Sequence, residues 1–217
     1  MKKKGIFLPQ ETMETCGISC ILMALTAFGK IRKPQSNLLD EKSTEAVFYD
    51  MYGCKATKGT LGSAIAYALS CRRLDVQLWH ESANLLENKG GYYPDELHAA
   101  LLREHREYIT RGGFSVQAGR SIDAQAMAAE LARDRLLIVQ CLIEGDADGM
   151  HDHVLHWILV FDEKDGEFLA YDPLYTPPSR NAPNFIRIPR SEMETLIGTP
   201  LGASLISVGE KNSSIYK

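Results

Sequence analysis

The stretch QETMETCGISC (Gln10–Cys20), followed at once by ILMALTAF, places a cysteine where a polar segment becomes a helix. Thr15 is a favourable N-cap, because its hydroxyl can accept a hydrogen bond from an unpaired amide of the first turn. The apolar residues that follow recur at helical spacing, so we expect one side of the helix to be buried. Cys16 then lies in the first turn, where free amides and the positive end of the helix dipole favour a thiolate. Gly17 allows a close approach of the backbone to another group, and the Gln10 side-chain amide can be aimed at the same point.

A histidine-rich segment, GMHDHVLHWILVF (Gly149–Phe161), lies far downstream. His156 precedes an apolar β-type run that ends at the turn DEKDGE, and a second run, FLAYDP, then brings Asp172 just before Pro173. Antiparallel pairing through this turn brings the start of the first strand beside the end of the second. We therefore expect His156 and Asp172 to be cross-strand neighbours, with the carboxylate orienting the imidazole. A nucleophile, a base and an orienting group are the parts of nucleophilic catalysis.

The order of these motifs resembles the C39 peptidases: a glutamine, Cys-Gly at a helix start, His-Trp on a strand, and Asp-Pro after a hairpin. That branch of the papain-like superfamily includes the bacteriocin-processing domains of peptide-exporting transporters. The resemblance implies Cys16 as nucleophile, His156 as general base and then acid, and Asp172 as the residue that orients His156. It also implies Gln10 as an oxyanion-hole donor beside the backbone amide of Cys16. Cys16 and His156 are about 140 positions apart, within the roughly 130–150 that separate these roles in papain-like enzymes.

Two features depart from the family's pattern. Thr15 stands where the family usually has an acidic residue before the Cys-Gly pair, and the middle of the chain is longer than a minimal C39 domain needs. Neither departure removes a catalytic residue. We therefore expect the chain to differ from the family in peptide specificity and in the shape of the substrate cleft.

The histidine segment leaves two alternatives open. His153 also lies near the strand start and is the rival for the base, although His156 is preferred because Trp157 and the apolar run follow it directly. The three histidines of HDHVLH, with Asp152, are also donors that zinc accepts. Their spacing does not suit one helix and no paired cysteines accompany them, so we assign no metal site and no cofactor. His151 and His153 are expected near the mouth of the cleft.

The cysteines are odd in number and scattered without metal-ligand spacing, so we expect free thiols in a reducing compartment: Cys16, Cys20, Cys54, Cys71 and Cys141. Cys20 falls one turn after Cys16 and is expected to be a buried packing residue, with a resolving role as the alternative. Cys141 lies in an apolar run and is expected in the core.

At 217 residues, with 45% hydrophobic and 24% charged residues, the chain has an ordinary globular composition. The length fits a single domain over residues 1–217, with a helical part at about 1–135 and a mainly β part at about 136–217. A net charge of −4 gives no electrostatic reason to expect nucleic acid binding. The start, MKKKGIFLPQ, has too few apolar residues for a signal peptide, and no run approaches the roughly 18 that a membrane helix needs. We expect a stand-alone cytoplasmic protein without membrane insertion.

The pattern of elements predicts an α+β fold. Helical patterns occupy residues 44–52, 61–71, 94–108 and 121–135, and an alternating stretch at 73–80 suits a short strand. Strand-like runs follow at residues 136–143, 156–161, 168–173, 185–189 and 203–209. Helices followed by an antiparallel sheet favour a papain-like arrangement: an N-terminal helical subdomain with the Cys16 helix, a C-terminal β-sheet subdomain, and a cleft between them.

The chemistry implied is an acyl-enzyme on Cys16. Water as the second nucleophile gives a peptidase or amidase that cleaves a peptide or amide bond. An amine gives an acyltransferase or amide synthetase that uses a carrier-protein-bound thioester, a route that the resemblance keeps open through a C39-like relative in polythioamide biosynthesis. Two other classes are a non-catalytic substrate-binding module and a metal-binding or redox-sensing protein. The joint presence of Gln10, Cys16, His156 and Asp172 argues against the binding module.

Overall fold

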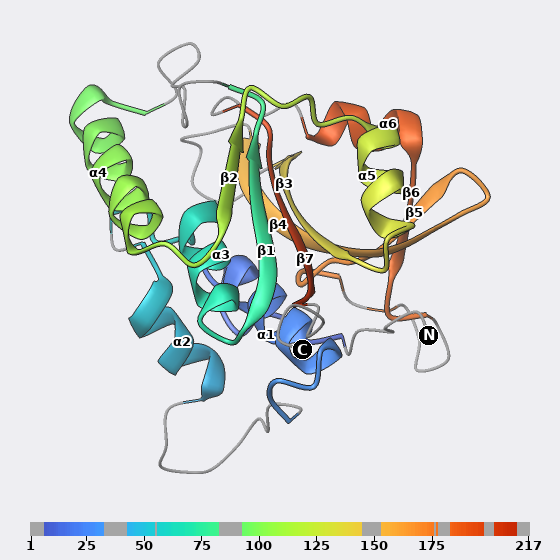
Figure 1. Ribbon diagram of the computed structural model, residues 1–217, viewed down its shortest axis with the longest axis horizontal. Coiled ribbons are helices and arrows are strands. Elements are labelled where there is room, and N and C mark those ends of the chain that lie inside the picture. The colour runs from blue at the N-terminus through green and yellow to red at the C-terminus, as the bar shows by residue number, and fades with distance from the viewer. Residues whose placement is uncertain are drawn as a thin grey trace, which may run out of the picture.

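The computed structural model describes residues 7–32, 43–54, 56–82, 93–144, 153–175, 177, 183–197 and 202–211 (Figure 1). A seven-stranded sheet in the order β2-β1-β7-β3-β4-β5-β6 forms its centre. Its strands are β1 (Leu74–His80), β2 (Ser115–Ala118), β3 (Leu136–Glu144), β4 (His153–Lys164), β5 (Glu167–Tyr171), β6 (Ile186–Pro189) and β7 (Ser204–Glu210). Six helices pack around the sheet within these ranges: α1 (Cys16–Ala27), α2 (Thr44–Tyr52), α3 (Gly62–Ser70), α4 (Asp95–Arg111), α5 (Ala124–Leu131) and α6 (Arg190–Leu196).

The predicted α+β class is confirmed, with one difference in how the sheet is built. Strands β1 and β2 come from the helical half of the chain and pair with each other in parallel, and β1 then joins β7 antiparallel. The sheet is therefore mixed, and the helical and β-rich halves share it. Strand β1 was predicted, whereas β2 and α6 were not, because elements of four and seven residues show too little periodicity.

Two clusters of buried apolar residues cover the two faces of the sheet. Along β4, Trp157 and Leu159 belong to the cluster that contains α1, α2 and α3, whereas Ile158 and Val160 belong to the cluster that contains α5 and α6. Successive residues of a strand point to opposite faces. A strand covered by helices on both faces therefore reads as the continuous apolar run WILV rather than as an alternation.

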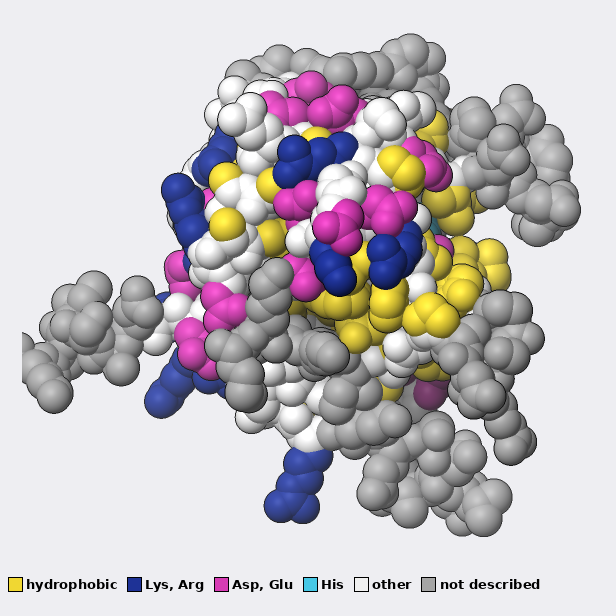
Figure 2. Space-filling model, turned by 90° about the vertical axis from the view of Figure 1, so that its right-hand side faces the viewer, with side chains coloured by type: hydrophobic (Ala, Val, Ile, Leu, Met, Phe, Trp, Pro, Cys, Tyr) yellow, Lys and Arg dark blue, Asp and Glu magenta, His cyan; other side chains and the backbone are white. Residues whose placement is uncertain are grey.

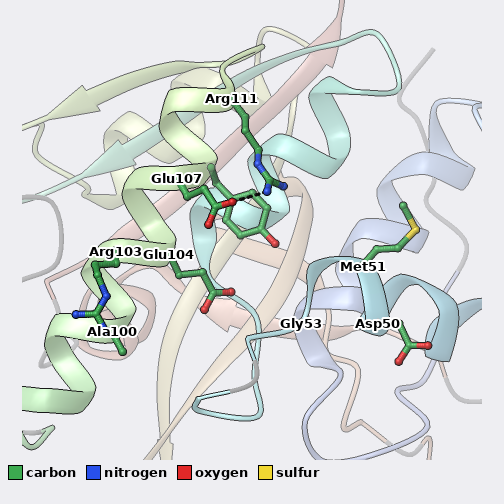
Figure 3. Close-up of a pocket in the computed structure, with 9 residues that line it drawn as sticks. Asp50, Met51, Gly53, Ala100, Arg103, Glu104, Glu107 and Arg111 are labelled. Carbon is green, nitrogen blue, oxygen red and sulfur yellow. Dashed lines mark hydrogen bonds and ion pairs between the residues drawn. The ribbon is translucent and has the colours of Figure 1, made fainter.

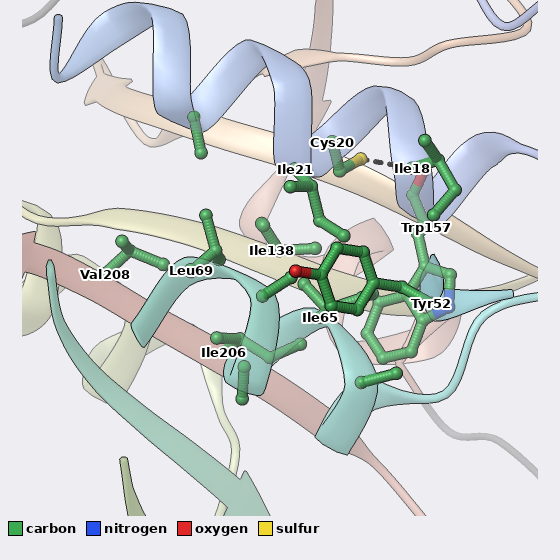
Figure 4. Packing of buried hydrophobic residues seen from close by; sticks show 14 of the residues in the cluster. Ile18, Cys20, Ile21, Tyr52, Ile65, Leu69, Ile138, Trp157, Ile206 and Val208 are labelled. Carbon is green, nitrogen blue, oxygen red and sulfur yellow. Dashed lines mark hydrogen bonds between the residues drawn. The ribbon is translucent and has the colours of Figure 1, made fainter. Parts of the chain in front are cut away.

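Helix α1 is buried more completely than its spacing predicted. Residues 16 to 25 are all buried, so the helix is enclosed on every side rather than along one face. Figure 4 shows Ile18, Cys20 and Ile21 of α1 in the cluster that also contains Ile138 and Val208 of the sheet. This burial fixes the position of the first turn of α1, on which Cys16 lies.

Within the described ranges, no helix has both the length and the apolar character needed to cross a membrane.

Candidate active site

Cys16 is the first residue of α1 and its side chain is buried, with 6% of its surface exposed. The predicted cap is wrong in detail: Thr15 occupies the N-cap position, but its hydroxyl donates to the Thr12 carbonyl at 2.9 Å and caps no amide of the helix. The first turn also has no acidic residue. No side chain of this turn therefore offsets the positive end of the helix dipole at Cys16.

Gly17, directly after Cys16, has the predicted role of permitting close contact. A Cβ atom on Gly17 would lie 2.7 Å from the Cβ of Thr60, just before α3. Real Cβ atoms do not approach so closely, so a larger residue at position 17 would push α1 away from α3. Trp157 hydrogen-bonds the same segment, since its indole nitrogen donates to the Thr60 carbonyl at 2.9 Å.

His156 and Asp172 are in direct contact. Nε2 of His156 lies 2.7 Å from Oδ1 of Asp172, and the imidazole is buried, with 2% of the residue exposed. The carboxylate is fixed by its own turn: the Leu174 amide donates to Oδ1 at 2.8 Å, and the Tyr175 amide donates to the Asp172 carbonyl at 2.9 Å. This is the local hydrogen bonding by which an aspartate organises a turn. The hydrogen bonds of the turn therefore fix the orientation of the Asp172 carboxylate independently of its contact with the imidazole.

A β-bulge brings these two side chains to the same face. From the tip of the hairpin, Lys164 pairs with Glu167 and Asp162 with Leu169, and regular pairing would next place Asp172 opposite Leu159. A register shift between Val160 and Asp162 makes Phe161 the extra residue, and Leu159 pairs instead with Tyr171. Continued one residue beyond the end of β5, this shifted register puts Asp172 opposite Ile158, two positions from His156 and so on the same face. The predicted cross-strand contact is therefore diagonal and depends on the bulge.

Aromatic side chains surround the bulge. Phe161 stacks on Tyr171 with ring centroids 4.4 Å apart, and Phe185 meets Phe161 edge to face at 5.8 Å. Phe7 lies 6.1 Å from Tyr171. The side of the molecule that carries β5 and β6 shows apolar side chains gathered among charged ones (Figure 2). The cluster Phe7, Phe161, Tyr171 and Phe185 thus supports the end of β5, from which Asp172 follows directly.

The pKa of His156 depends on both Asp172 and Cys16. Burial alone would lower its pKa, but hydrogen bonds to Asp172 and Cys16, together with the charges of both residues, raise it to about 9. Because Nε2 faces Asp172, Nδ1 is the nitrogen left for the Cys16 thiol. An imidazole with this pKa is protonated at neutral pH.

Cys20 is the packing cysteine that was predicted. It is fully buried, and its thiol donates to the Trp157 carbonyl at 3.5 Å, a contact drawn in Figure 4. Burial, followed by the charge of Cys16, raises the pKa of Cys20 well above its usual range. Its thiol therefore stays protonated and ties α1 to β4 next to His156. All five cysteines are free, as predicted, and Cys141 is buried in the core.

Gln10 lies beside the Asp172 turn, and one of its two side-chain N–H donors is engaged by a neighbouring carbonyl. Its backbone amide donates to the Pro173 carbonyl at 3.1 Å, and its side-chain Nε2 donates to the Thr12 carbonyl at 2.8 Å. The side-chain oxygen is buried without a hydrogen-bond partner. The second N–H of Nε2 is the donor that an oxyanion would use, and the oxyanion role of Gln10 stays a prediction.

The structure does not test the positions predicted for the side chains of His151 and His153. His151 lies outside the described residues, and of His153 only the backbone at the start of β4 is described, opposite Glu144. Among the described residues, no group of three or more histidine, cysteine or acidic side chains is arranged to hold a metal ion.

One contact near the site was missed by sequence reasoning. Glu45, in the first turn of α2, is buried, and its carboxylate accepts the Glu11 amide at 2.8 Å. In the sequence, an acidic residue two positions after Ser43 looks like an ordinary helix-start acid, because carboxylates there interact favourably with the dipole. Only the packing of α2 against α1 turns this side chain inward.

A groove of about 670 Å³ lies between α2 and α4 (Figure 3). Its walls mix acidic and basic side chains with one thioether and one phenol: Asp50, Met51, Gly53, Ala100, Arg103, Glu104, Glu107, Tyr108 and Arg111. Arg111 pairs with Glu107 inside the groove, and the Cys54 thiol donates to Glu104 at 3.2 Å. None of the candidate catalytic residues lines it.

The chain is similar in fold to solved structures over nearly its whole length. One is the double glycine motif protease from an AMS/PCAT transporter in complex with the leader peptide, at 12% identity and a TM-score of 0.49, covering 96% of this chain and 94% of that one. Another, from Bacillus anthracis, is described as a C39-like peptidase, at 9% identity and a TM-score of 0.49, covering 97% of both chains. No family model matches the sequence, and no curated protein matches it. At these identities the likeness concerns the fold alone.

Proposed function

We propose that this protein is a cysteine-nucleophile hydrolase of peptide or amide bonds that works through an acyl-enzyme on Cys16. One observation carries the proposal: the buried imidazole of His156 interacts at once with Asp172, at 2.7 Å, and with Cys16, and its pKa is raised to about 9. A buried imidazolium is costly unless charges of opposite sign compensate it. A thiolate at Cys16 and the carboxylate of Asp172 provide that compensation.

The chemistry follows from this pairing. The Cys16 thiolate attacks the acyl carbonyl, an S–C bond forms, and the carbonyl oxygen becomes an oxyanion, for which the Cys16 backbone amide and Gln10 are the proposed donors. The proton on Nδ1 of His156 passes to the leaving amine as the C–N bond breaks. His156, now neutral, takes a proton from water as the water attacks the thioester. Breakage of the S–C bond releases the acid and restores the thiolate beside the imidazolium.

An acylation experiment tests the proposal without a known substrate. p-Nitrophenyl acetate should give a burst of about one p-nitrophenolate per protein, with the acetyl group on the peptide that contains Cys16. Cys16→Ala should abolish the burst, and Cys71→Ala, at an exposed thiol far from the site, should leave it intact. A burst that persists in Cys16→Ala, or an acetyl group on Cys71 instead, would overturn the proposal.

The decay of the acetyl-enzyme tests hydrolysis against transfer. A hydrolase releases acetate at a rate that added glycinamide changes little, whereas an amide synthetase passes the acetyl group to the amine in preference to water. We expect acetate as the main product. Predominant N-acetylglycinamide at millimolar amine would instead assign the chain to the acyltransferase class.

A further inference from the structure

The carboxylate of Glu45 connects the segment before the nucleophile to the helix after it. The residue is 5% exposed. Its Oε1 accepts the backbone amide of Glu11 at 2.8 Å, and its Oε2 accepts the Ser19 hydroxyl at 3.4 Å. The Thr15 hydroxyl also lies near the carboxylate, although its proton is donated to the Thr12 carbonyl at 2.9 Å. One side chain of α2 therefore binds residues on both sides of Cys16 in the sequence.

This carboxylate is withdrawn from water at a cost. Burial raises its pKa, and the surrounding hydrogen bonds, those from the Glu11 amide and Ser19 among them, offset only part of that rise. A buried carboxylate loses hydration and is tolerated where donors replace the lost water. Here the replacement donors all belong to the loop Gln10–Thr15 and to α1, so the ionised side chain favours the conformation in which those donors converge.

The other end of the same loop is attached to the catalytic aspartate's turn. The Gln10 amide donates to the Pro173 carbonyl at 3.1 Å, directly after Asp172. A second contact from α2 reinforces the middle of the loop, since the Tyr49 hydroxyl donates to the Glu14 carboxylate at 3.1 Å. The loop is thus held between the Asp172 turn and α2, with Cys16 at its end.

We propose that Glu45 is a positioning residue that fixes the loop Gln10–Thr15, and so pre-organises the two oxyanion donors, the side chain of Gln10 and the backbone amide of Cys16. This role rests on the proposed function, since the donors matter only if Cys16 is acylated. Donors held in place before reaction stabilise the oxyanion without reorganisation, and a supporting shell of hydrogen bonds holds them there.

Two reactions of the same thiol separate this role from a general structural one. Acylation by p-nitrophenyl acetate passes through an oxyanion, whereas alkylation by iodoacetamide does not. Glu45→Ala should slow the acylation burst by about 10- to 100-fold, the range expected for misplaced oxyanion donors. The rate of Cys16 alkylation should change little. Glu45→Gln should restore most of the burst, because its amide oxygen still accepts the Glu11 amide.

Glu130→Gln is the matched control. Glu130 is another buried carboxylate, 2% exposed, but it accepts the Ser207 hydroxyl in the sheet and lies on α5. We expect this variant to lose stability to urea while both reactions of Cys16 keep their rates. If Glu45→Ala does not fold, Glu45→Asp, whose carboxylate is one methylene short, should show the same selective loss of acylation.

Two results would overturn the positioning role: an unchanged burst in Glu45→Ala, or equal slowing of acylation and alkylation. The second would mean that Glu45 supports the nucleophile or the fold rather than the oxyanion donors. Absence of a burst in the unmodified protein would contradict the proposed function itself, and the role of Glu45 with it, so the two failures are distinguishable.

Discussion

His156 Nε2 lies 2.7 Å from Asp172 Oδ1, although regular pairing of their strands would send the two side chains to opposite faces of the sheet. The extra residue Phe161 shifts the register of the hairpin by one residue, which brings the two side chains to the same face and makes the contact possible. The contact is one of the interactions, with those of Cys16, that raise the pKa of the imidazole against the effect of burial. A feature of the backbone ladder therefore determines the electrostatics of the candidate site.

The orienting role of Asp172 predicts a graded loss of activity. Asp172→Asn should slow the acylation burst by less than the roughly 10⁴-fold that the equivalent change costs a serine triad, because a thiolate–imidazolium pair can persist without the carboxylate. The pKa of His156, followed by NMR, should fall clearly below about 9. His156→Ala should be nearly as damaging as Cys16→Ala, since members of one catalytic unit are not additive. A His153→Ala variant that loses the burst while His156→Ala keeps it would reverse the assignment of the base.

The nucleophile should differ from the other cysteines in reactivity. At neutral pH iodoacetamide should label Cys16 much faster than Cys54, Cys71 or Cys141. Burial raises the pKa of both the Cys54 and the Cys141 thiol, and the exposed Cys71 lies beside Tyr52 and Tyr67. Peptide mapping after brief labelling measures the order. Equal labelling of all the cysteines in the native protein would contradict the assignment.

The oxyanion role of Gln10 predicts a large effect on turnover and a small one on binding. Gln10→Ala should lower the acylation rate by roughly 10²–10³, the usual loss for one oxyanion donor. Gln10→Glu keeps the length and removes the side-chain donor, so it should behave like the alanine variant. Full activity in both would make Gln10 a loop residue whose backbone contact to Pro173 is its main role.

The raised pKa of His156 predicts how stability depends on pH. The folded protein binds this proton more tightly than the unfolded chain, because the pKa rises from 6.5 to about 9. The stabilisation is therefore complete below about pH 6.5 and is lost as pH rises through about 9. The free energy of unfolding in urea should fall across this window, and the fall should be smaller in Asp172→Asn. An unmodified protein with equal stability at both ends of the window would rule out the link.

A pair of buried histidines predicts that the stability of the protein is sensitive to acid. His80 and His105 are buried with ring centroids 5.1 Å apart, and burial lowers the pKa of His80 to about 4 and that of His105 to about 3. The unfolded chain binds these protons more tightly, so stability is lost as pH falls below 6.5. Neither nitrogen of His105 has a hydrogen-bond partner, so His105→Leu should cost little at pH 7 and should reduce the acid sensitivity. Unfolding in urea at pH 7 and pH 4.5 measures both effects, and equal acid sensitivity in the variant would contradict the assignment.

The sequence by itself determined most of the elements, all but β2 and α6, and the order of the catalytic candidates. The Cys16 helix, the hairpin between His156 and Asp172 and the later strands all depend on periodicity and turn residues within short stretches of chain. Such signals are local, because apolar spacing and turn preference act among neighbouring residues. The packing role of Cys20 was predictable for the same reason, since one helical turn relates it to Cys16.

Only the tertiary structure decided which side chains and backbone groups of these elements contact one another. Thr15 turns its hydroxyl to Thr12 rather than capping α1, Phe161 becomes an extra residue in the ladder, and Glu45 points inward to the loop before the nucleophile. Strand β2 joins the sheet although its four residues show no clear pattern. Each of these outcomes depends on which segments, distant in the sequence, pack together and where their hydrogen-bonding groups can be satisfied. Burial compels such groups to find partners, and a local pattern of residues does not specify the partner.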